Sequence, residues 1–253
     1  MPMARSYRDI TPSAARRIKL IMADVDGTLN TGGDELSLAV RDVIDGLQKL
    51  GIIIGLVSGR TDPMLVRMAA GLGIGGPLIS ENGAVARLRH DSGLVDLGYS
   101  RRPALEALGK LKAKYPGRIR EREDNSERLI DVVFRADGIP AAELQKGLKD
   151  VQLLDSTYIL HLMPKGIDKG KTLLKLLGKI DMGKVRKDEV LVAGDSMTDL
   201  SLFKLFPLSI LIPNPDITAA ESKVLRKTAA YISDHEAGEG FVELASHIIN
   251  IRT

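Results

Sequence analysis

Short apolar runs alternate with amphipathic stretches along this chain, and that alternation constrains the fold more than any other feature. The runs are Ile18–Ala23, Ile52–Val57, Pro77–Ile79, Val190–Ala193 and Leu208–Ile212. Their nearly continuous apolar character is typical of parallel strands that are buried on both faces. Between the first two runs, Leu36–Leu50 repeats its apolar residues with the period of a helix and is followed by Gly51. The alternation predicts the α/β class, with a doubly wound, Rossmann-like parallel sheet.

The middle of the chain lacks this parallel pattern. Arg102–Tyr115 is typical of a helix, and Leu129–Arg135 is typical of a strand. With 253 residues, the chain has room for a core and a smaller inserted unit. We therefore predict an α/β core made of residues 1–84 and 164–253, with an inserted α+β unit over residues 85–163.

The composition of the chain argues against several kinds of site and partner. The chain has no cysteine, which excludes disulfides, thiolate nucleophiles and cysteine-bound metals. The net charge is only +3, aromatic residues make up 4% and there is no Trp, so we expect no nucleic-acid partner. The apolar runs are too short to span a bilayer, and Met1–Arg17 lacks the apolar centre of a secretory signal. We expect a cytoplasmic protein that is a monomer or a homodimer and does not bind membranes.

Two carboxylates follow the first apolar run, in "LIMADVDGTLN". Asp24 and Asp26 stand where the predicted strand ends, and Gly27 allows the chain to turn so that both can face one centre. In open α/β sheets, functional sites lie at the carboxyl ends of the strands. Taken alone, a simple Asp-Gly turn explains this stretch equally well.

Two other predicted strands also end in polar groups. Ser58 and Gly59 offer a hydroxyl and an unhindered amide that suit a phosphate oxygen, although an ordinary turn has the same composition. Asp195 and Asp199 are four residues apart, so on a helix they share a face and repel each other unless a cation lies between them. Such oxygen ligands suit Mg²⁺. The alternative is a helix-capping aspartate with an exposed neighbour.

The fourth polar cluster, "KGIDKGKT", resembles a P-loop. A P-loop has glycine, four residues, and then Gly-Lys-Ser/Thr, but only three residues separate Gly166 from Gly170. Asp168 is suited to cap a helix, which places Lys169 in the first turn. A cation is favoured there only when an anion is also bound. The alternative is a solvated lysine among several.

Together, "DVDGT", "SGR", Lys169-Gly170 and "GDSMTD" resemble the four motifs of the haloacid dehalogenase-like hydrolase superfamily. "SENGA" at Ser80–Ala84 resembles the branch with a large cap between the second and third motifs. That branch holds Cof-type phosphatases, sucrose-phosphatase-like enzymes, archaeal-type phosphoglycolate phosphatases and phosphomannomutases. The resemblance implies that residues 85–163 are this cap, and it assigns the third motif to Lys169 rather than Lys171. Thr198 stands where many relatives have Asn.

The resemblance implies hydrolysis of a phosphate monoester through an aspartyl-phosphate. Asp24 would be the nucleophile, and Asp26 would protonate the leaving oxygen and then deprotonate the attacking water. The phosphate would be bound by Ser58, Gly59 and Lys169.

The same resemblance implies Mg²⁺ as the cofactor. Its ligands would be Asp24, the main-chain carbonyl of Asp26, Asp195 and Asp199. The substrate would be a small-molecule phosphate ester: a sugar phosphate, or a small organic phosphate such as phosphoglycolate. Two alternatives stay open. One is a phosphomutase of the phosphomannomutase type, and the other is a non-hydrolytic aspartyl-phosphate signalling or sensor protein.

Overall fold

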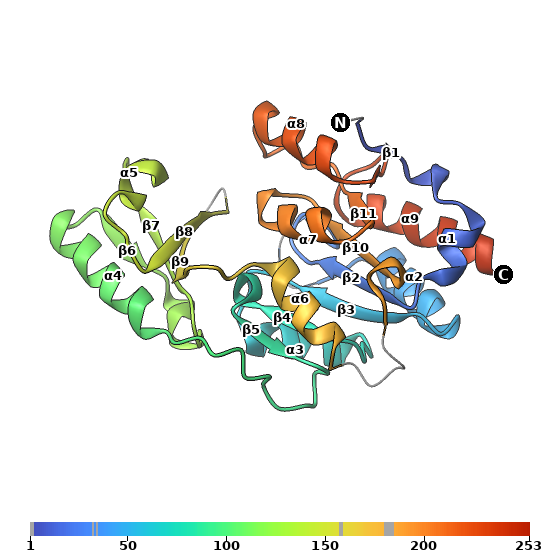
Figure 1. The fold of residues 1–253 in the computed structure, drawn as a ribbon, viewed down its shortest axis with the longest axis horizontal. Helices are drawn as coiled ribbons and strands as arrows, with labels where there is room; N and C mark the ends of the chain where they lie inside the picture. The colour runs from blue at the N-terminus through green and yellow to red at the C-terminus, as the bar shows by residue number, and fades with distance from the viewer. Residues whose placement is uncertain (1–2, 32, 34, 157–158, 180–184) are drawn as a thin grey trace.

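The computed structural model describes residues 3–31, 33, 35–156, 159–179 and 185–253. Figure 1 shows a larger part built around one sheet and, at the left, a smaller part with a sheet of its own. Among the described residues, the strand order is β1-β12-β11-β10-β2-β3-β4-β5 in the larger sheet and β6-β7-β9-β8 in the smaller one. Within those same ranges, no helix combines the length and the apolar character needed to cross a membrane.

The predicted apolar runs form the centre of the larger sheet. β2 (Leu20–Asp24) lies between β3 (Ile53–Val57) and β10 (Val190–Gly194), and it pairs with both in parallel. β4 (Leu78–Ser80) and β11 (Leu208–Leu211) continue the parallel order on either side. The chain therefore runs outward from β2 in one direction and later returns to build the other half. This confirms the predicted doubly wound parallel sheet.

The edges of this sheet are strands that the sequence analysis did not predict. β12 (Tyr231–Ile232) and β1 (Arg5–Ser6) extend the parallel half, and β5 (Val85–Arg87) pairs antiparallel with β4. Strands of two or three residues are too short to show a periodic pattern. Because β5 belongs to the larger sheet, the chain leaves that sheet slightly after the predicted boundary between residues 84 and 85. The division into core and cap stays a prediction.

Helices cover both faces of the larger sheet. One face carries α1 (Pro12–Arg17), α2 (Leu38–Lys49), α3 (Asp62–Gly71) and α9 (Ala237–Arg252). The other carries α6 (Lys169–Leu177), α7 (Leu200–Leu205) and α8 (Ala219–Thr228). Alternating side chains of β2 feed the two cores: Ile21 and Ala23 pack on the first side, Leu20 and Met22 on the second. Both faces are buried, which explains the uninterrupted apolar run.

In the described residues, the smaller part has an antiparallel sheet and two helices, which fits the α+β character expected of the insert. Its strands are β6 (Ile119–Glu121), β7 (Val132–Ala136), β8 (Val151–Asp155) and β9 (Leu160–Pro164). Its helices are α4 (Arg102–Lys114) and α5 (Ala141–Gln145). Leu108 and Leu111 of α4 pack against Phe134 and Leu162 of the sheet, so this part has a core of its own.

One predicted strand of the smaller part begins later than expected. The apolar pattern predicted Leu129–Arg135, whereas β7 starts at Val132. The backbone N–H groups of residues 129–131 donate instead to the carboxylate of Glu81, in the short turn after β4. A contact with a residue far away in the sequence therefore replaces strand pairing at this point.

Candidate active site

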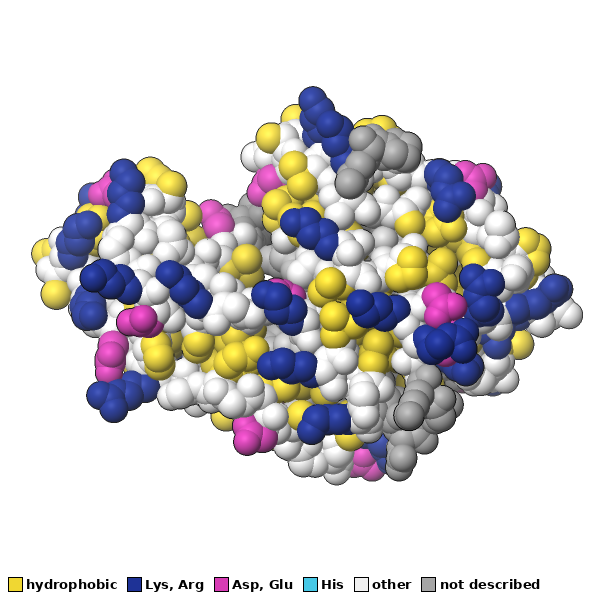
Figure 2. Space-filling model, in the orientation of Figure 1, with side chains coloured by type: hydrophobic (Ala, Val, Ile, Leu, Met, Phe, Trp, Pro, Cys, Tyr) yellow, Lys and Arg dark blue, Asp and Glu magenta, His cyan; other side chains and the backbone are white. Residues whose placement is uncertain are grey.

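Most of the predicted site residues meet at the carboxyl ends of three adjacent strands. Asp24 ends β2, Ser58 follows β3 and Asp195 follows β10. A cavity of about 640 Å³ lies there, between the larger sheet and the smaller part. Figure 2 shows the molecule hollowed between these two parts, with Lys and Arg side chains scattered over this face. Of the predicted residues, those that line the cavity are Asp24, Asp26, Ser58, Gly59, Lys169 and Asp195.

Three buried carboxylates crowd together beneath this cavity. One oxygen from each of Asp24, Asp195 and Asp199 lies within 4.8 Å of the others. Burial and the neighbouring Asp199 raise the pKa of Asp24 well above its usual range, and they raise the pKa of Asp195 to about 7. A divalent cation would relieve this repulsion, and Mg²⁺ prefers carboxylate oxygens. The donor set therefore fits the predicted metal.

Asp199 lies deepest of the three and has the most protein partners. Its Oδ2 accepts the backbone N–H groups of Asp195 at 3.1 Å and Ser196 at 3.2 Å. Its Oδ1 accepts a hydrogen bond from Lys169. Asp199 was predicted to bind Mg²⁺ together with Asp195, four residues earlier. It does not line the cavity itself. Its contacts fix the loop that carries Asp195.

Gly27 makes room for Asp195. Its φ is +77°, and a Cβ atom at this position would stand 2.3 Å from Oδ2 of Asp195. Thr28 Oγ1 donates to Asp195 Oδ1 at 3.3 Å, and Asn214 Nδ2 donates to Oδ2. The sequence analysis missed Asn214. It follows β11, so the same argument from polar residues at strand ends could have found it.

Lys169 is the cation of this cluster. Its side chain is only 1% exposed, and its Nζ donates to Asp199 Oδ1 at 2.8 Å, Asp24 Oδ2 at 3.0 Å and Thr198 Oγ1 at 3.0 Å. Burial by itself lowers the pKa of Lys169, but the carboxylates of Asp199 and Asp24 outweigh it and the net pKa is raised. The ammonium is therefore charged. Thr198, whose role the sequence left open, positions it.

Lys171 lies on the other side of the same helix. Its side chain is 58% exposed and pairs with Asp168 at 2.9 Å, while its backbone N–H donates to the capping carboxylate of Asp168 at 2.7 Å. Side chains two residues apart on a helix point roughly 200° apart, so only one of the two lysines can face the cavity. The lysine in the P-loop position is thus the one at the surface. That Lys169 binds a phosphate stays a prediction.

Asp26 lines the cavity, and both oxygens of its carboxylate accept hydrogen bonds from Arg60. Arg60 Nε donates to Asp26 Oδ2 at 2.9 Å, and Arg60 Nη2 donates to Oδ1 at 2.7 Å. The Asp26 side chain is 48% exposed and that of Arg60 only 10%. Ser58 Oγ accepts the backbone N–H of Arg60 at 3.1 Å, which links this pair to the predicted phosphate-binding turn. The sequence analysis quoted "SGR" but gave Arg60 no role.

A different buried carboxylate joins the larger sheet to the smaller part. Glu81 is fully buried and accepts the backbone N–H groups of Leu129 at 2.7 Å, Ile130 at 2.8 Å and Asp131 at 2.8 Å. Burial and the nearby Asp131 carboxylate raise the pKa of Glu81 to about 7, although the three N–H groups oppose this. The sequence analysis used Glu81 only as part of "SENGA".

Side chains strengthen the same contact. Arg128 Nη1 donates to the carbonyl oxygen of Gly59 at 3.1 Å and to Asp131 Oδ1 at 2.8 Å. His161 Nδ1 lies 2.7 Å from Asp131 Oδ2 and 3.3 Å from Asn82 Nδ2. The smaller part is therefore hydrogen-bonded to Gly59, which follows Ser58, whose hydroxyl is predicted to bind phosphate. No local pattern predicts the contacts of Arg128 with Gly59 or of His161 with Asp131 and Asn82, because these partners are far apart in the sequence.

Comparison with curated proteins gives the same family as the motifs. Residues 21–114 and 109–243 match the model of the family described as haloacid dehalogenase-like hydrolase. The phosphoglycolate phosphatase of Methanospirillum hungatei is 32% identical, over 88% of this chain and 94% of that protein. The phosphoglycolate phosphatase of Thermoplasma volcanium is 29% identical, over 91% of this chain and 98% of that protein.

Solved structures share the fold of this chain. A Thermoplasma acidophilum protein, 0175, has a TM-score of 0.77 and 26% identity, over 91% of this chain and 98% of that one. The sucrose-phosphatase of Synechocystis shares the fold at a TM-score of 0.68 and 17% identity, over 90% of this chain and 97% of that one. Since the family match spans most of the sequence and full-length relatives are phosphatases, this chain belongs to the haloacid dehalogenase-like hydrolase family and is a phosphatase.

Proposed function

We propose that this phosphatase hydrolyses small organic phosphate monoesters with the help of Mg²⁺, through an aspartyl-phosphate on Asp24. One observation carries the proposal. Three buried carboxylates lie together beneath an open cavity, and Lys169 Nζ donates to two of them, Asp24 at 3.0 Å and Asp199 at 2.8 Å. Such a cluster is poorly balanced by the protein alone, whereas a divalent cation and a bound phosphate would complete it.

Asp24 forms the bond to phosphorus in this proposal. A carboxylate oxygen of Asp24 attacks the phosphoryl group while the bond to the leaving oxygen breaks on the opposite side. Ser58, the backbone amide of Gly59 and Lys169 hold the remaining phosphoryl oxygens, and Lys169 stabilises the charge that spreads over them. Water then cleaves the acyl phosphate and restores the Asp24 carboxylate.

Asp26 moves the proton in both steps. It donates a proton to the leaving oxygen in the first step and accepts one from the attacking water in the second. Mg²⁺, held by Asp24, the main-chain carbonyl of Asp26, Asp195 and Asp199, would neutralise part of the charge on the nucleophile and the phosphate.

We also propose that residues 85–163 act as a cap that selects the substrate. This segment lines the cavity with Arg122, Arg128, Ser156 and His161, and also with the acidic Asp124 and Asp155. Arg122 Nε donates to Asp124 Oδ1 at 3.0 Å, and the other N–H groups of its guanidinium suit a second anionic group on the substrate, because a planar fork of donors matches a carboxylate. Phosphoglycolate, the substrate in the names of the relatives, has such a carboxylate, and we propose it as the first substrate to test. Sugar phosphates are the second class to test.

A substrate screen tests this proposal. The purified protein is assayed with Mg²⁺ for phosphate release from a panel of sugar phosphates, phosphorylated acids and nucleotides. We expect release from small esters, with phosphoglycolate among the best. Turnover of a hexose phosphate that depends on added sugar bisphosphate, without phosphate release, would favour a phosphomutase instead. A stable phosphoprotein with no turnover on any ester would favour a signalling protein.

A further inference from the structure

We infer that Arg60 is a positioning residue, one that sets the carboxyl group of Asp26 for proton transfer to the leaving oxygen. The inference rests on the proposed function, because it gives Arg60 its role through the acid–base role proposed for Asp26. The bidentate contact between the two side chains carries it, with donor–acceptor distances of 2.7 and 2.9 Å.

The guanidinium is far better fixed than the carboxylate it holds. Arg60 is 10% exposed on its side chain, and it also donates to the carbonyl oxygen of Gly33 in the loop after Asp26. Asn30 Nδ2 donates to the same carbonyl at 2.8 Å. Asp26 is 48% exposed and stands on a turn, so without this contact its side chain could adopt other rotamers. A planar fork that binds both oxygens fixes the plane of the carboxyl group.

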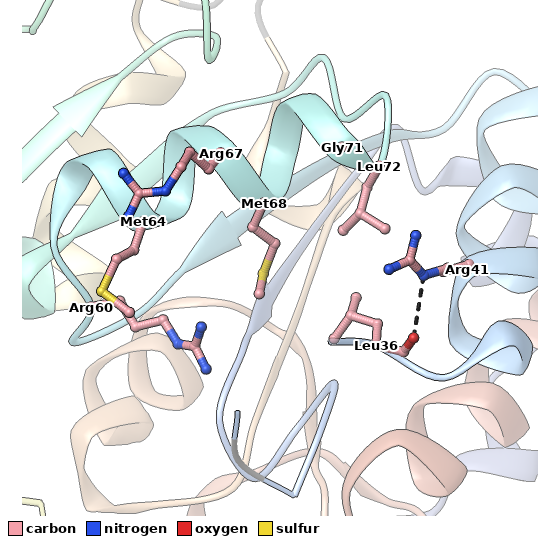
Figure 3. A pocket seen from close by; sticks show the side chains of 8 residues that line it. All are labelled: Leu36, Arg41, Arg60, Met64, Arg67, Met68, Gly71 and Leu72. Carbon is pink, nitrogen blue, oxygen red and sulfur yellow. Dashed lines mark hydrogen bonds between the residues drawn. The ribbon is translucent and has the colours of Figure 1, made fainter. Parts of the chain in front are cut away.

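A neighbouring pocket shows how Arg60 is supported. A cavity of about 240 Å³ behind the active site is lined in part by Arg60 and by Met64, Arg67 and Met68 of α3. In Figure 3, the guanidinium of Arg60 extends away from α3, the helix that carries Met64, Arg67 and Met68. Arg60 and Met64 line both this pocket and the active-site cavity. The arginine is thus part of the wall between them rather than a mobile surface group.

The chemistry explains why such a residue matters. As Asp24 bonds to phosphorus and the ester bond breaks, the proton of Asp26 passes to the leaving oxygen and Asp26 becomes a carboxylate. That carboxylate is the partner that the Arg60 guanidinium binds in the structure, and it next accepts a proton from the attacking water. Misplacement of a reacting group by about 1 Å can cost on the order of a hundredfold in rate.

Leaving-group dependence separates this role from a merely structural one. An alkoxide leaving group needs the proton, whereas p-nitrophenolate departs readily without it. We would measure kcat and KM for Arg60→Met, Asp26→Asn and the double variant, with p-nitrophenyl phosphate and with the best alkyl phosphate of the substrate screen. The comparison uses kcat/KM, which reports the step that breaks the ester bond, because kcat also includes the later attack by water, in which Asp26 acts for every ester. We expect Arg60→Met to lower kcat/KM by roughly 30- to 100-fold on the alkyl ester and by less than about fivefold on the aryl ester. The double variant should lose no more than Asp26→Asn.

Controls make the outcomes distinct. Arg67→Met alters an arginine of the same adjacent pocket that is not a partner of Asp26, and it should leave both rates unchanged. Arg60→Lys should recover part of the alkyl-ester rate, and it serves as the test variant if Arg60→Met does not fold. Equal losses of kcat/KM on the two esters would overturn the positioning role. An Asp26→Asn variant whose kcat/KM does not discriminate between the esters would instead refute the proton donation by Asp26 that the proposed function includes.

Discussion

Two sets of buried carboxylates lie near the active site, and their surroundings differ in kind. Beneath the cavity, one oxygen from each of Asp24, Asp195 and Asp199 lies within 4.8 Å of the others, and Lys169 Nζ donates to Asp24 and Asp199. Between the two parts of the molecule, Glu81 accepts three backbone N–H groups from residues 129–131. In the first set, three neighbouring carboxylates face one ammonium among the described residues. In the second, three backbone donors serve one carboxylate.

This difference in hydrogen-bond donors and charge indicates a separate function for each group of carboxylates. A carboxylate saturated by backbone N–H groups has no need of an outside ligand, so Glu81 holds one part of the protein to the other. Carboxylates that repel one another under an open cavity gain stability from a ligand that brings positive charge. The floor of the cavity is therefore suited to binding and reaction, and the Glu81 contact to attachment. Each prediction below tests one side of this contrast.

The largest effect is expected from the proposed nucleophile. Asp24→Asn should lower turnover by on the order of 10⁴-fold or more, since loss of a nucleophile removes the covalent route. Steady-state assays measure the loss, and trapping with hydroxylamine tests for an acyl phosphate in the unaltered protein. Asp26→Asn is the control, because it should still form the phosphoenzyme from an aryl ester. Near-normal turnover by Asp24→Asn would contradict the assignment.

Metal removal comes next. EDTA should abolish turnover and Mg²⁺ should restore it, whereas Ca²⁺, with its larger and looser coordination, should not. A second readout is thermal unfolding: Mg²⁺ at a hundredfold its Kd should add about 2.7 kcal/mol to the stability of the resting protein. Asp195→Asn should lose most of that gain. Full activity in EDTA, or equal stabilisation of the Asp195→Asn variant, would remove the metal from the proposal.

The two lysines of "KGIDKGKT" give a smaller effect with an internal control. Lys169→Ala should cost on the order of 3 kcal/mol in the barrier, or a hundredfold or more in rate, because a charge-stabilising contact in a buried site is lost. Lys171→Ala should change the rate little, since its exposed pair with Asp168 contributes little. Parallel assays of the two variants, with an ATP-binding titration, decide the matter. A greater loss for Lys171→Ala would point back to a P-loop.

The same contrast shows which features the sequence could predict. The sheet, and the residues at the strand ends beneath the cavity, could be predicted from local patterns. Buried apolar runs that end in polar residues indicate parallel strands, and the carboxyl ends of parallel strands lie together at one edge of the sheet. Asp24, Ser58 and Asp195 were predicted in this way, and the structure places them around one cavity. The choice of Lys169 over Lys171 came from the resemblance to the family, since helix geometry predicts only that the two side chains point apart.

The attachment between the two parts was not predictable. Glu81 and residues 129–131 are nearly fifty positions apart, and neither stretch has a pattern that names the other as its partner. The role of Arg60 is hidden in the same way, because its partner Asp26 comes from a different strand end. Contacts between side chains and distant backbone groups depend on the finished fold, so composition and periodicity do not reveal them.

Glu81 provides the smallest and last of these tests, which concerns stability rather than rate. Its pKa is raised by burial from an ordinary value of 4.5 to about 7. Between these values the folded protein keeps a proton that the unfolded chain has lost, so stability falls as pH rises toward 7. From pH 5 to pH 8 this group should remove roughly 2 to 3 kcal/mol. Glu81→Gln cannot titrate, so it should lack this part of the pH dependence.

Urea unfolding followed by circular dichroism at pH 5 and pH 8 measures this difference between the two proteins. At pH 5, where folded Glu81 is protonated, Glu81→Gln should be close in stability to the unaltered protein, because a protonated carboxyl and an amide each have one full acceptor oxygen. As pH rises to 8, the unaltered protein should lose stability that Glu81→Gln keeps. Glu106→Gln is the matched control: Arg102 lowers the pKa of the exposed Glu106, which therefore stays ionised throughout this range. If Glu81→Gln keeps the full pH dependence of stability, a group other than Glu81 binds the proton. The proposed difference between the carboxylates beneath the cavity and Glu81 would then be wrong.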